Sequence, residues 1–486
     1  MLNMKRKNLL SILTLVVFAM MLPNAAFASG EALGDKLPLW SMLPFLGMLL
    51  SIAIFPLVKE HWWEKNQLQV ALFWSVVFLV PFFFAYGASE TIYQLIHTLV
   101  LDYVPFLLLL FALYVVAGGI VVKGSLVGDA KLNTIILAIG TVLASIIGTT
   151  GAAMVLIRPL IRANEWRKRK VHTIVFFIFL VCNIGGALTP VGDPPLFMGF
   201  LRGVPFFWTT VHILPLYLFN SIILLALYFF IDKKMQAKDI AEGCVQPAAG
   251  GEKIKIEGLH NVIFIVLILF AVVMSGTLAQ SPAFQTADGA VKGLKLYSLH
   301  GHDLIATWPN IMKDALLLLA AFLSMKTTKK EVREYNNFNW AAMEEVVKLF
   351  LGIFITMIPA LAILGARGAS LGLNSEWQFF WATGMLSGFL DNTPTYLVFL
   401  TTAAALGATE GMVTTIGTVA VPILTAVSAG AVFMGALSYI GNAPNFMVRS
   451  IAEENKIKMP SFFGYMKWSF GILIPLFIID TLVFML

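Results

Sequence analysis

The sequence contains little charge and almost no cysteine. Of its 486 residues, 12% are charged, whereas about 25% are charged in an average soluble domain. Two cysteines, Cys182 and Cys244, are too few for a disulfide or metal framework. No P-loop, nucleophile elbow or histidine-rich metal cluster occurs. These absences disfavour a soluble fold, a nucleotide-driven pump and a membrane enzyme, so we expect no enzymatic activity and no resident cofactor.

Long apolar segments are abundant instead. Hydrophobic residues make up 59% of the chain, and the mean hydropathy is +0.85. A helix of about 20 apolar residues crosses a hydrocarbon core of about 30 Å, and the continuous apolar runs exclude the alternation of a barrel strand. The predicted spans are Leu39–Val58, Val70–Tyr86, Asp102–Val122, Leu132–Ile147, Val171–Leu188, Phe206–Ile231, Val262–Leu278, Ile311–Ser324, Val346–Leu364, Met412–Ser438 and Trp468–Phe484. The expected fold is an all-α polytopic membrane protein with one transmembrane domain over residues 29–486.

The first residues have the pattern of a bacterial-type export signal. Lys5, Arg6 and Lys7 precede a short apolar region that ends in the small-residue pattern of Ala26 to Ala28. This predicts a signal peptide over residues 1–28. A first span that is retained is the alternative.

Basic residues in short loops orient the predicted helices. The loops 162–170, 233–238 and 326–333 are rich in Lys and Arg, which favours the cytoplasmic side, whereas loop 281–309 is poor in them. We therefore expect a multi-pass protein of the inner (plasma) membrane, with a hydrophilic loop over about 233–259. The net charge of +6 resides in such loops and does not indicate nucleic-acid binding.

One polar motif occurs twice in apolar surroundings. Residues 186–199 read GALTPVGDPPLFMG and residues 435–448 read GALSYIGNAPNFMV, so half of the aligned positions are identical. Only Arg202 is basic between the first copy and the next span, whereas several basic residues follow the second, so the copies point in opposite directions. Inverted repeats with broken helices are typical of secondary transporters. We place the repeats at about 100–232 and 340–486.

A second polar break precedes each copy of this motif. Residues 148–153 read GTTGAA and residues 390–396 read LDNTPTY. The segments around them, 148–162 and 378–402, are too short or too polar for simple crossings, and we expect re-entrant hairpins. Helix ends at such tips expose backbone groups, and neighbouring hydroxyl and amide oxygens suit hard cations such as Na⁺.

Two carboxylates, Asp193 and Asp391, lie inside these breaks. A charged side chain at the bilayer centre costs about 3 kcal/mol on insertion scales, so it is functional or paired. Such a carboxylate can exchange a proton for a metal cation. The alternative is a structural ion pair with Arg158, Arg162 or Arg202.

The candidate site combines both breaks of each repeat. Its predicted ion- or substrate-binding residues are Thr149, Thr150, Asp193, Asp391, Asn392, Thr393 and Asn442, with Thr189, Gly192, Gly441, Asn445 and Arg158 in support. Na⁺ is expected at Asp391, Asn392, Thr393 and Asp193. Other polar residues lie near predicted span ends, where we expect solvated or interfacial roles: Asp102, His97, His172, His212 and Asp480.

These motifs resemble the ion transporter superfamily, which includes NhaD-type sodium/proton antiporters, arsenite permeases and citrate or dicarboxylate carriers. LDNTPTYLVFL at 390–400 is similar to the Asp-Asn-x-Pro hairpin of NhaD-type antiporters, and GALTPVGDPP at 186–195 is similar to the Thr-Pro-x-Gly-Asp turn of that branch. The tips depart from the Ser-Asn-Thr pattern usual in dicarboxylate carriers. The resemblance implies a scaffold part, a homodimer, and a transport part that moves as an elevator.

The leading functional hypothesis from the sequence is Na⁺/H⁺ antiport at Asp193 and Asp391. The alternative is a Na⁺- or H⁺-coupled carrier of citrate or a dicarboxylate, in which Arg158 or Arg202 would help to hold the anion. The expected partners are the lipid bilayer, small inorganic cations and organic acids, with no nucleic acid.

Overall fold

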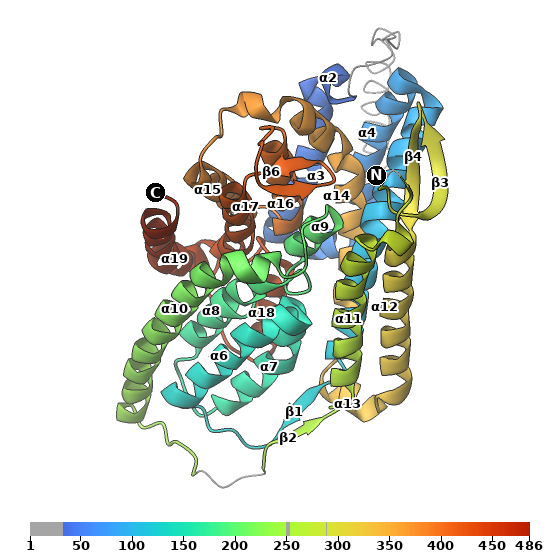
Figure 1. The fold of residues 1–486 in the computed structure, drawn as a ribbon. Coiled ribbons are helices and arrows are strands. Elements are labelled where there is room, and N and C mark those ends of the chain that lie inside the picture. Colours follow the sequence, from blue (N-terminus) through green and yellow to red (C-terminus); the bar gives the residue numbers. More distant parts are fainter. Residues whose placement is uncertain (1–32, 249–252, 288) are drawn as a thin grey trace, which may run out of the picture.

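The computed structural model describes residues 33–248, 253–287 and 289–486 (Figure 1). The predicted signal peptide lies outside these residues. The fold is helical, and eight helices of the described residues are long and apolar enough to cross a membrane. This confirms the prediction of an all-α polytopic membrane protein. The strands form three separate two-stranded pairs, β1 with β2, β3 with β4 and β5 with β6.

Seven of the larger helical elements form one group, in which the two halves of the chain exchange partners. In the first half they are α3 (Leu43–Val58), α4 (Glu60–Ile96), the π-helix η2 (His97–Tyr103) and α5 (Val104–Ala117). In the second half they are α11 (Asn261–Ala279), α12 (Trp308–Thr327) and α14 (Ala341–Arg367). Helices α3 and α4 pack on α14, while α11 and α12 pack on α5. Two helices of each half therefore pack against one helix of the other half.

The remaining large helices form two series, in which the same kinds of element follow one another in the same order. The first series is α6 (Ala130–Ile147), α7 (Thr149–Ala163), α8 (Val171–Leu180), η3 (Ile184–Leu188), α9 (Pro194–Leu201) and α10 (Trp208–Ala241). The second series is α15 (Glu376–Ser387), α16 (Asn392–Ala404), α17 (Val421–Phe433), η6 (Met434–Leu437), α18 (Ala443–Glu454) and α19 (Phe462–Phe484). Each series is a helical hairpin, a broken helix and a long helix.

The small elements lie in the connections. They are α2 (Leu33–Lys36), η1 (Leu39–Met42), β1 (Val121–Lys123), β2 (Lys255–Glu257), η4 (Pro282–Phe284), β3 (Gly293–Leu299), β4 (His302–Thr307), α13 (Lys330–Tyr335), η5 (Gly368–Leu371), β5 (Met412–Thr414) and β6 (Gly417–Val419). Strand β1 pairs with β2 from Val121 opposite Glu257 to Lys123 opposite Lys255. This pairing connects the segment before α6 to the segment before α11.

One predicted span forms a helix of crossing length, and another is wrong in detail. Leu132–Ile147 lies in α6, which is 18 residues long and apolar enough to cross a membrane. It is also the first arm of a hairpin, because the chain reverses at Gly148, whose φ is +80°. The ends of the hairpin meet where the Gly128 amide donates to the Ala163 carbonyl at 2.7 Å. Met412–Ser438 begins with the β5–β6 hairpin, so its helix starts only at Val421.

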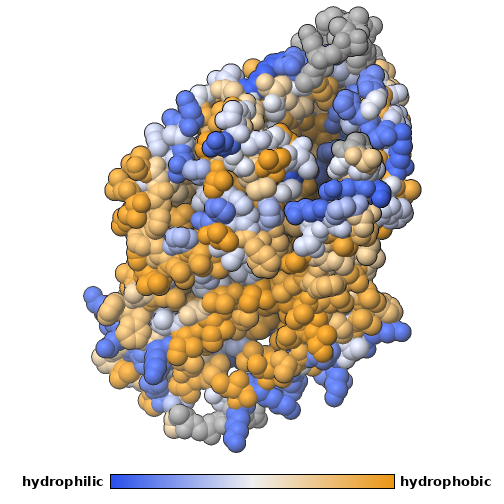
Figure 2. All heavy atoms as spheres, in the orientation of Figure 1, coloured by the Kyte–Doolittle hydropathy of each residue, from blue (hydrophilic) through white to orange (hydrophobic). Residues whose placement is uncertain are grey.

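The basic segments and the loop poor in basic residues lie at opposite ends of the molecule. The strands β1 and β2, helix α13 and the end of α10 lie at the lower end of Figure 1, and the basic segments 162–170, 233–238 and 326–333 belong to these elements or adjoin them. The β3–β4 pair lies at the opposite end, and loop 281–309 contains it. Figure 2 shows a broad band of hydrophobic residues between hydrophilic residues above and below it. The protein is therefore a multi-pass membrane protein.

Candidate functional site

Both broken helices are opened by the same local structure. Asp193 is the N-cap of α9 and Asn442 is the N-cap of α18, and each α-helix has a proline within its first two positions. Proline is tolerated there because the first turn needs no N–H donor. A Cβ atom on Gly192 would collide with the carbonyl of Gly186 in the first turn. In the second turn, Gly441 approaches Gly435 in the same way, and its Cβ would lie 2.5 Å from that carbonyl.

Each hairpin tip is tied to the broken helix of its own series by an equivalent hydrogen bond. The Thr189 hydroxyl donates to the carbonyl of Ser145 at 2.5 Å, and the Ser438 hydroxyl donates to the carbonyl of Gly388 at 2.5 Å. Ser145 lies three residues before the N-cap of α7, and Gly388 lies three residues before the N-cap of α16. The two halves therefore share their contacts as well as their order of elements.

Asp193 lies at the centre of a buried cluster that joins the two halves. Its carboxylate accepts hydrogen bonds from Thr149 Oγ1 at 3.1 Å, Asn392 Nδ2 at 2.6 Å and Asn442 Nδ2 at 3.1 Å. Each of these four side chains belongs to a residue that is at most 2% exposed. One donor comes from each hairpin and one from the second broken helix, so the structure brings together four of the predicted site residues.

The cluster is also the meeting point of four helix starts. Thr149 and Asn392 are the first residues of α7 and α16, while Asp193 and Asn442 are the N-caps of α9 and α18. A helix start exposes backbone N–H groups and the positive end of the helix dipole, which favours anions. Among these four helices, only α16 has a side-chain cap.

That cap is Asp391. Its Oδ1 accepts from the Thr393 backbone amide at 3.0 Å, and its backbone carbonyl accepts from Thr395 Oγ1 at 2.9 Å. The Thr393 hydroxyl in turn donates to Asn392 Oδ1 at 3.4 Å. Asp391 therefore fixes the start of α16 and lies beside the cluster, and its role in binding an ion stays a prediction.

A second layer of amides supports the cluster, and part of it was missed from the sequence. Asn442 Nδ2 also donates to the Cys182 carbonyl at 3.0 Å, and Asn183 Nδ2 donates to Asn445 Oδ1 at 2.8 Å. Asn445 Nδ2 bonds the carbonyls of Gly435 and Ser438 at 2.9 Å each. Asn183 was identifiable as a lone amide in an apolar run directly before the first repeated motif.

Two predicted residues lie at the margin of the cluster or away from it. Thr150 follows Thr149 in the first turn of α7 and is partly exposed. Arg158 lies nine residues after Thr149 on α7, which corresponds to about 13 Å along a helix. It lines a separate pocket with Arg162 and Tyr335. Arg158 is therefore not part of the Asp193 cluster.

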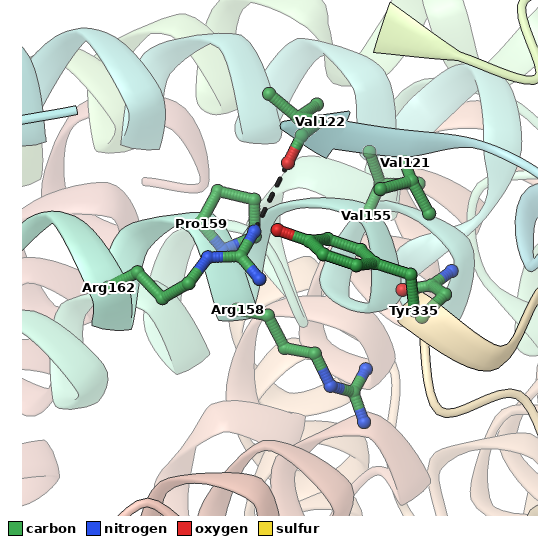
Figure 3. A pocket seen from close by; sticks show the side chains of 8 residues that line it. Val121, Val122, Val155, Arg158, Pro159, Arg162 and Tyr335 are labelled. Carbon is green, nitrogen blue, oxygen red and sulfur yellow. Dashed lines mark hydrogen bonds between the residues drawn. The ribbon is translucent and has the colours of Figure 1, made fainter. Parts of the chain in front are cut away.

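The alternative of an ion pair between Asp193 and an arginine is wrong. Arg202 instead forms a bidentate pair with Asp102, at 2.5 and 2.8 Å, and both residues are buried. Arg162 donates to the Val122 carbonyl at 3.1 Å. Asp193 is held by neutral donors, since Arg162 and Arg202 have other partners and Arg158 lies in a separate pocket (Figure 3).

Interfacial roles were also wrongly predicted for three buried residues. Asp102 pairs with Arg202, as described above. His172 Nε2 lies 2.6 Å from Asp232, and the carboxylate of Asp480 accepts from Asn220 Nδ2 at 2.8 and 3.0 Å. All three residues are at most 4% exposed. By contrast, His97 and His212 are partly exposed.

Comparison with known proteins identifies the family of this chain. No curated protein matches the sequence. A family model described as "Putative citrate transport" matches residues 34–485. The matched range includes both hairpins, both broken helices and the whole Asp193 cluster. The chain therefore belongs to this citrate transport family of membrane proteins.

Proposed function

We propose that this protein is a secondary transporter that carries citrate or a related organic acid together with Na⁺ or H⁺. The observation that carries the proposal is the convergence of four helix starts on one buried cluster at Asp193. Backbone amides at such positions bind carboxylate oxygens without a dedicated positive side chain. The family match supports the same substrate class.

A cation must accompany the anion, because two acidic residues lie at the helix starts. Asp193 and Asp391 would repel a carboxylate in a medium of low dielectric constant. Na⁺ bound among Asp193, Asp391, Asn392 and Thr393, or protons on the two carboxylates, would remove that repulsion. For Na⁺ to bind at Asp193, the amide of Asn392 must turn its Oδ1 toward the ion, since its Nδ2 now donates to the carboxylate.

Na⁺/H⁺ antiport without an organic acid fits the family match less well. Antiport needs only the acidic residues, and it gives no role to the three helix starts that lack a side-chain cap. We therefore favour the coupled carrier over the antiporter that the sequence first indicated.

The two groups of helices suggest how the carrier works. We propose that α3–α5 and α11–α14 form a scaffold, and that α6–α10 and α15–α19 form the part that moves across the inner membrane with the substrate. In this arrangement the scaffold would also form a homodimer. The Asp193 cluster then travels as a unit, because all of its donors belong to the moving part.

Reconstituted proteoliposomes test this function. Uptake of labelled citrate is measured with an inward Na⁺ gradient, with an inward proton gradient and with neither, and protein-free vesicles provide the background. We expect citrate to accumulate only with one of the gradients. A parallel set without citrate carries a pH-sensitive dye. Proton movement driven by Na⁺ alone, with no citrate uptake, would refute the proposal in favour of antiport.

A further inference from the structure

A buried ion pair connects the two groups of helices. Arg202, at the C-cap of α9, donates from its two terminal nitrogens to the carboxylate of Asp102 at 2.5 and 2.8 Å. Asp102 lies in the π-helix η2 of the proposed scaffold, whereas α9 belongs to the part that we propose to move. Both residues are buried. The strongest type of side-chain pair, a bidentate guanidinium–carboxylate contact, therefore crosses the boundary between these parts.

A second charged contact holds the same helix. Lys313 of the scaffold helix α12 places its Nζ atom 5.1 Å from the centre of the Phe197 ring of α9, and both residues are 0% exposed. The Nζ atom also lies 3.4 Å from Asp314 Oδ1, but it has no hydrogen-bond partner among the described residues. A buried cation is costly without partners, and an aromatic ring attracts it. The Phe197 ring therefore stabilises Lys313 in this conformation.

The apolar side chains of α9 pack against the scaffold between these two contacts. Phe197 and Phe200 are three residues apart and lie on one face of the helix, with ring centres 6.0 Å apart. A Cβ atom on Gly276 of α11 would lie 3.2 Å from the Phe200 ring. One face of α9 is therefore in contact with η2, α11 and α12 of the scaffold.

Helix α9 extends from the Asp193 cluster toward one face of the membrane. It starts after its N-cap Asp193 and ends at Leu201. The next helix, α10, has 34 residues, which corresponds to about 51 Å, and its end lies at the basic end of the molecule (Figure 1). Its start and the preceding Arg202 therefore lie toward the opposite end, which we assign to the outer face.

We propose that the Asp102–Arg202 pair and the Lys313–Phe197 contact form an outer latch, which holds α9 against the scaffold and closes the Asp193 cluster toward the outer face. The proposal rests on the proposed function, since it assumes that α9 moves with the substrate relative to the scaffold. Both contacts then break when the moving part opens the cluster to the outer face. Buried charges suit a latch, because opening is costly until water or new partners reach them.

The test compares citrate transport from the two faces in oriented proteoliposomes. The apparent affinity at each face scales with the fraction of the carrier that is open to that face, so the ratio of outer to inner half-saturating citrate reports the closed population. The variants are Asp102→Asn with Arg202→Gln, which keeps polar groups at both positions, and Phe197→Leu, which keeps every charge. The matched control is Arg449→Gln with Glu453→Gln, because this ion pair of 3.1 Å lies within α18 alone.

We expect the double variant Asp102→Asn with Arg202→Gln to lower this ratio about tenfold, as the loss of a charged hydrogen bond implies. Phe197→Leu should lower it about threefold, the usual effect of one cation–π contact. The α18 control should leave it within about twofold. A ratio that is unchanged or raised in both test variants would refute the outer latch while citrate transport stands. A wild type that carries no citrate from either face would refute the proposed function itself.

A cross-linking measurement tests whether the contact has to open. Asp102→Cys with Arg202→Cys is made in a Cys244→Ser background and linked with a short, reducible bifunctional thiosulfonate. We expect the link to stop citrate transport and a reductant to restore it. The control is Asn261→Cys with Ser324→Cys, two scaffold positions whose side chains are hydrogen-bonded at 2.6 Å, and its link should leave transport intact. Normal transport by protein linked between positions 102 and 202 would overturn the proposal.

Discussion

Replacing Asn442 by alanine removes one of the three donors that hold the Asp193 carboxylate. The Nδ2 atom of Asn442 lies 3.1 Å from that carboxylate and 3.0 Å from the Cys182 carbonyl, so truncation leaves two buried acceptors with one donor fewer. A hydrogen bond to a charged group contributes about 1.5–3 kcal/mol. If citrate binding requires the intact cluster, this free energy corresponds to about a 10- to 150-fold weaker binding of citrate.

We expect Asn442→Ala to raise the half-saturating citrate concentration by that factor and to weaken the dependence on the coupling cation. The assay is initial-rate uptake in proteoliposomes over a range of citrate and Na⁺ concentrations. Asn261→Ala is the matched control, because it removes a buried amide that bonds Gly119 and Gly258 carbonyls in the proposed scaffold. If Asn442→Ala keeps both half-saturating values within about twofold of the wild type, the Asp193 cluster is not part of the binding site.

Other predictions test the cap, the buried ion pair and the orientation. Asp391→Ala should lower the free energy of unfolding by about 1 kcal/mol, because the α16 cap is lost. Asp391→Asn should keep most of the stability of the wild type, since asparagine is also a good N-cap. Equal thermal stability of the two variants in detergent would contradict this assignment. Asp102→Asn or Arg202→Gln alone should lower the free energy of unfolding by about 3–5 kcal/mol, and the double variant should recover much of this loss. Strictly additive losses in a double-mutant cycle would show that the two side chains are not coupled. A membrane-impermeant maleimide should label Cys244 in inside-out vesicles only and leave the buried Cys182 unmodified; labelling of Cys244 in right-side-out vesicles would reverse the orientation.

The breaks in the helices could be predicted from sequence because their cause is local. The turns at Gly192 and Gly441 require glycine, because backbone contacts leave no room for a Cβ atom, and the prolines that follow suit only the first turn of a helix. The second hairpin was predicted at residues 378–402 and is found at Glu376–Ala404. The first was harder to recognise, because α6 is 18 residues long and its length alone suits a crossing.

The buried polar partners could not be predicted because they are distant in the chain. Asp480 and Asn220 are separated by 260 positions, Arg202 and Asp102 by 100, and His172 and Asp232 by 60. Hydropathy places such residues near the end of a span, but it does not show which helix covers them. By contrast, the contact of Asp391 with the Thr393 amide is local, and an aspartate before Asn-Thr-Pro is compatible both with this N-cap and with an ion ligand.

The site combines a symmetric backbone with an asymmetric distribution of charge. Matched positions in the two series are Gly148 and Asp391, Thr149 and Asn392, and Asp193 and Asn442, and each pair carries at most one carboxylate. If both members of the first and last pairs were acidic, four carboxylates would surround one buried cluster, and their mutual repulsion would be large at low dielectric constant. The amide of Asn442 avoids this repulsion and also supplies a donor to Asp193. In the first and last pairs, the neutral member therefore allows the acidic member to be buried at the meeting point of the four helices.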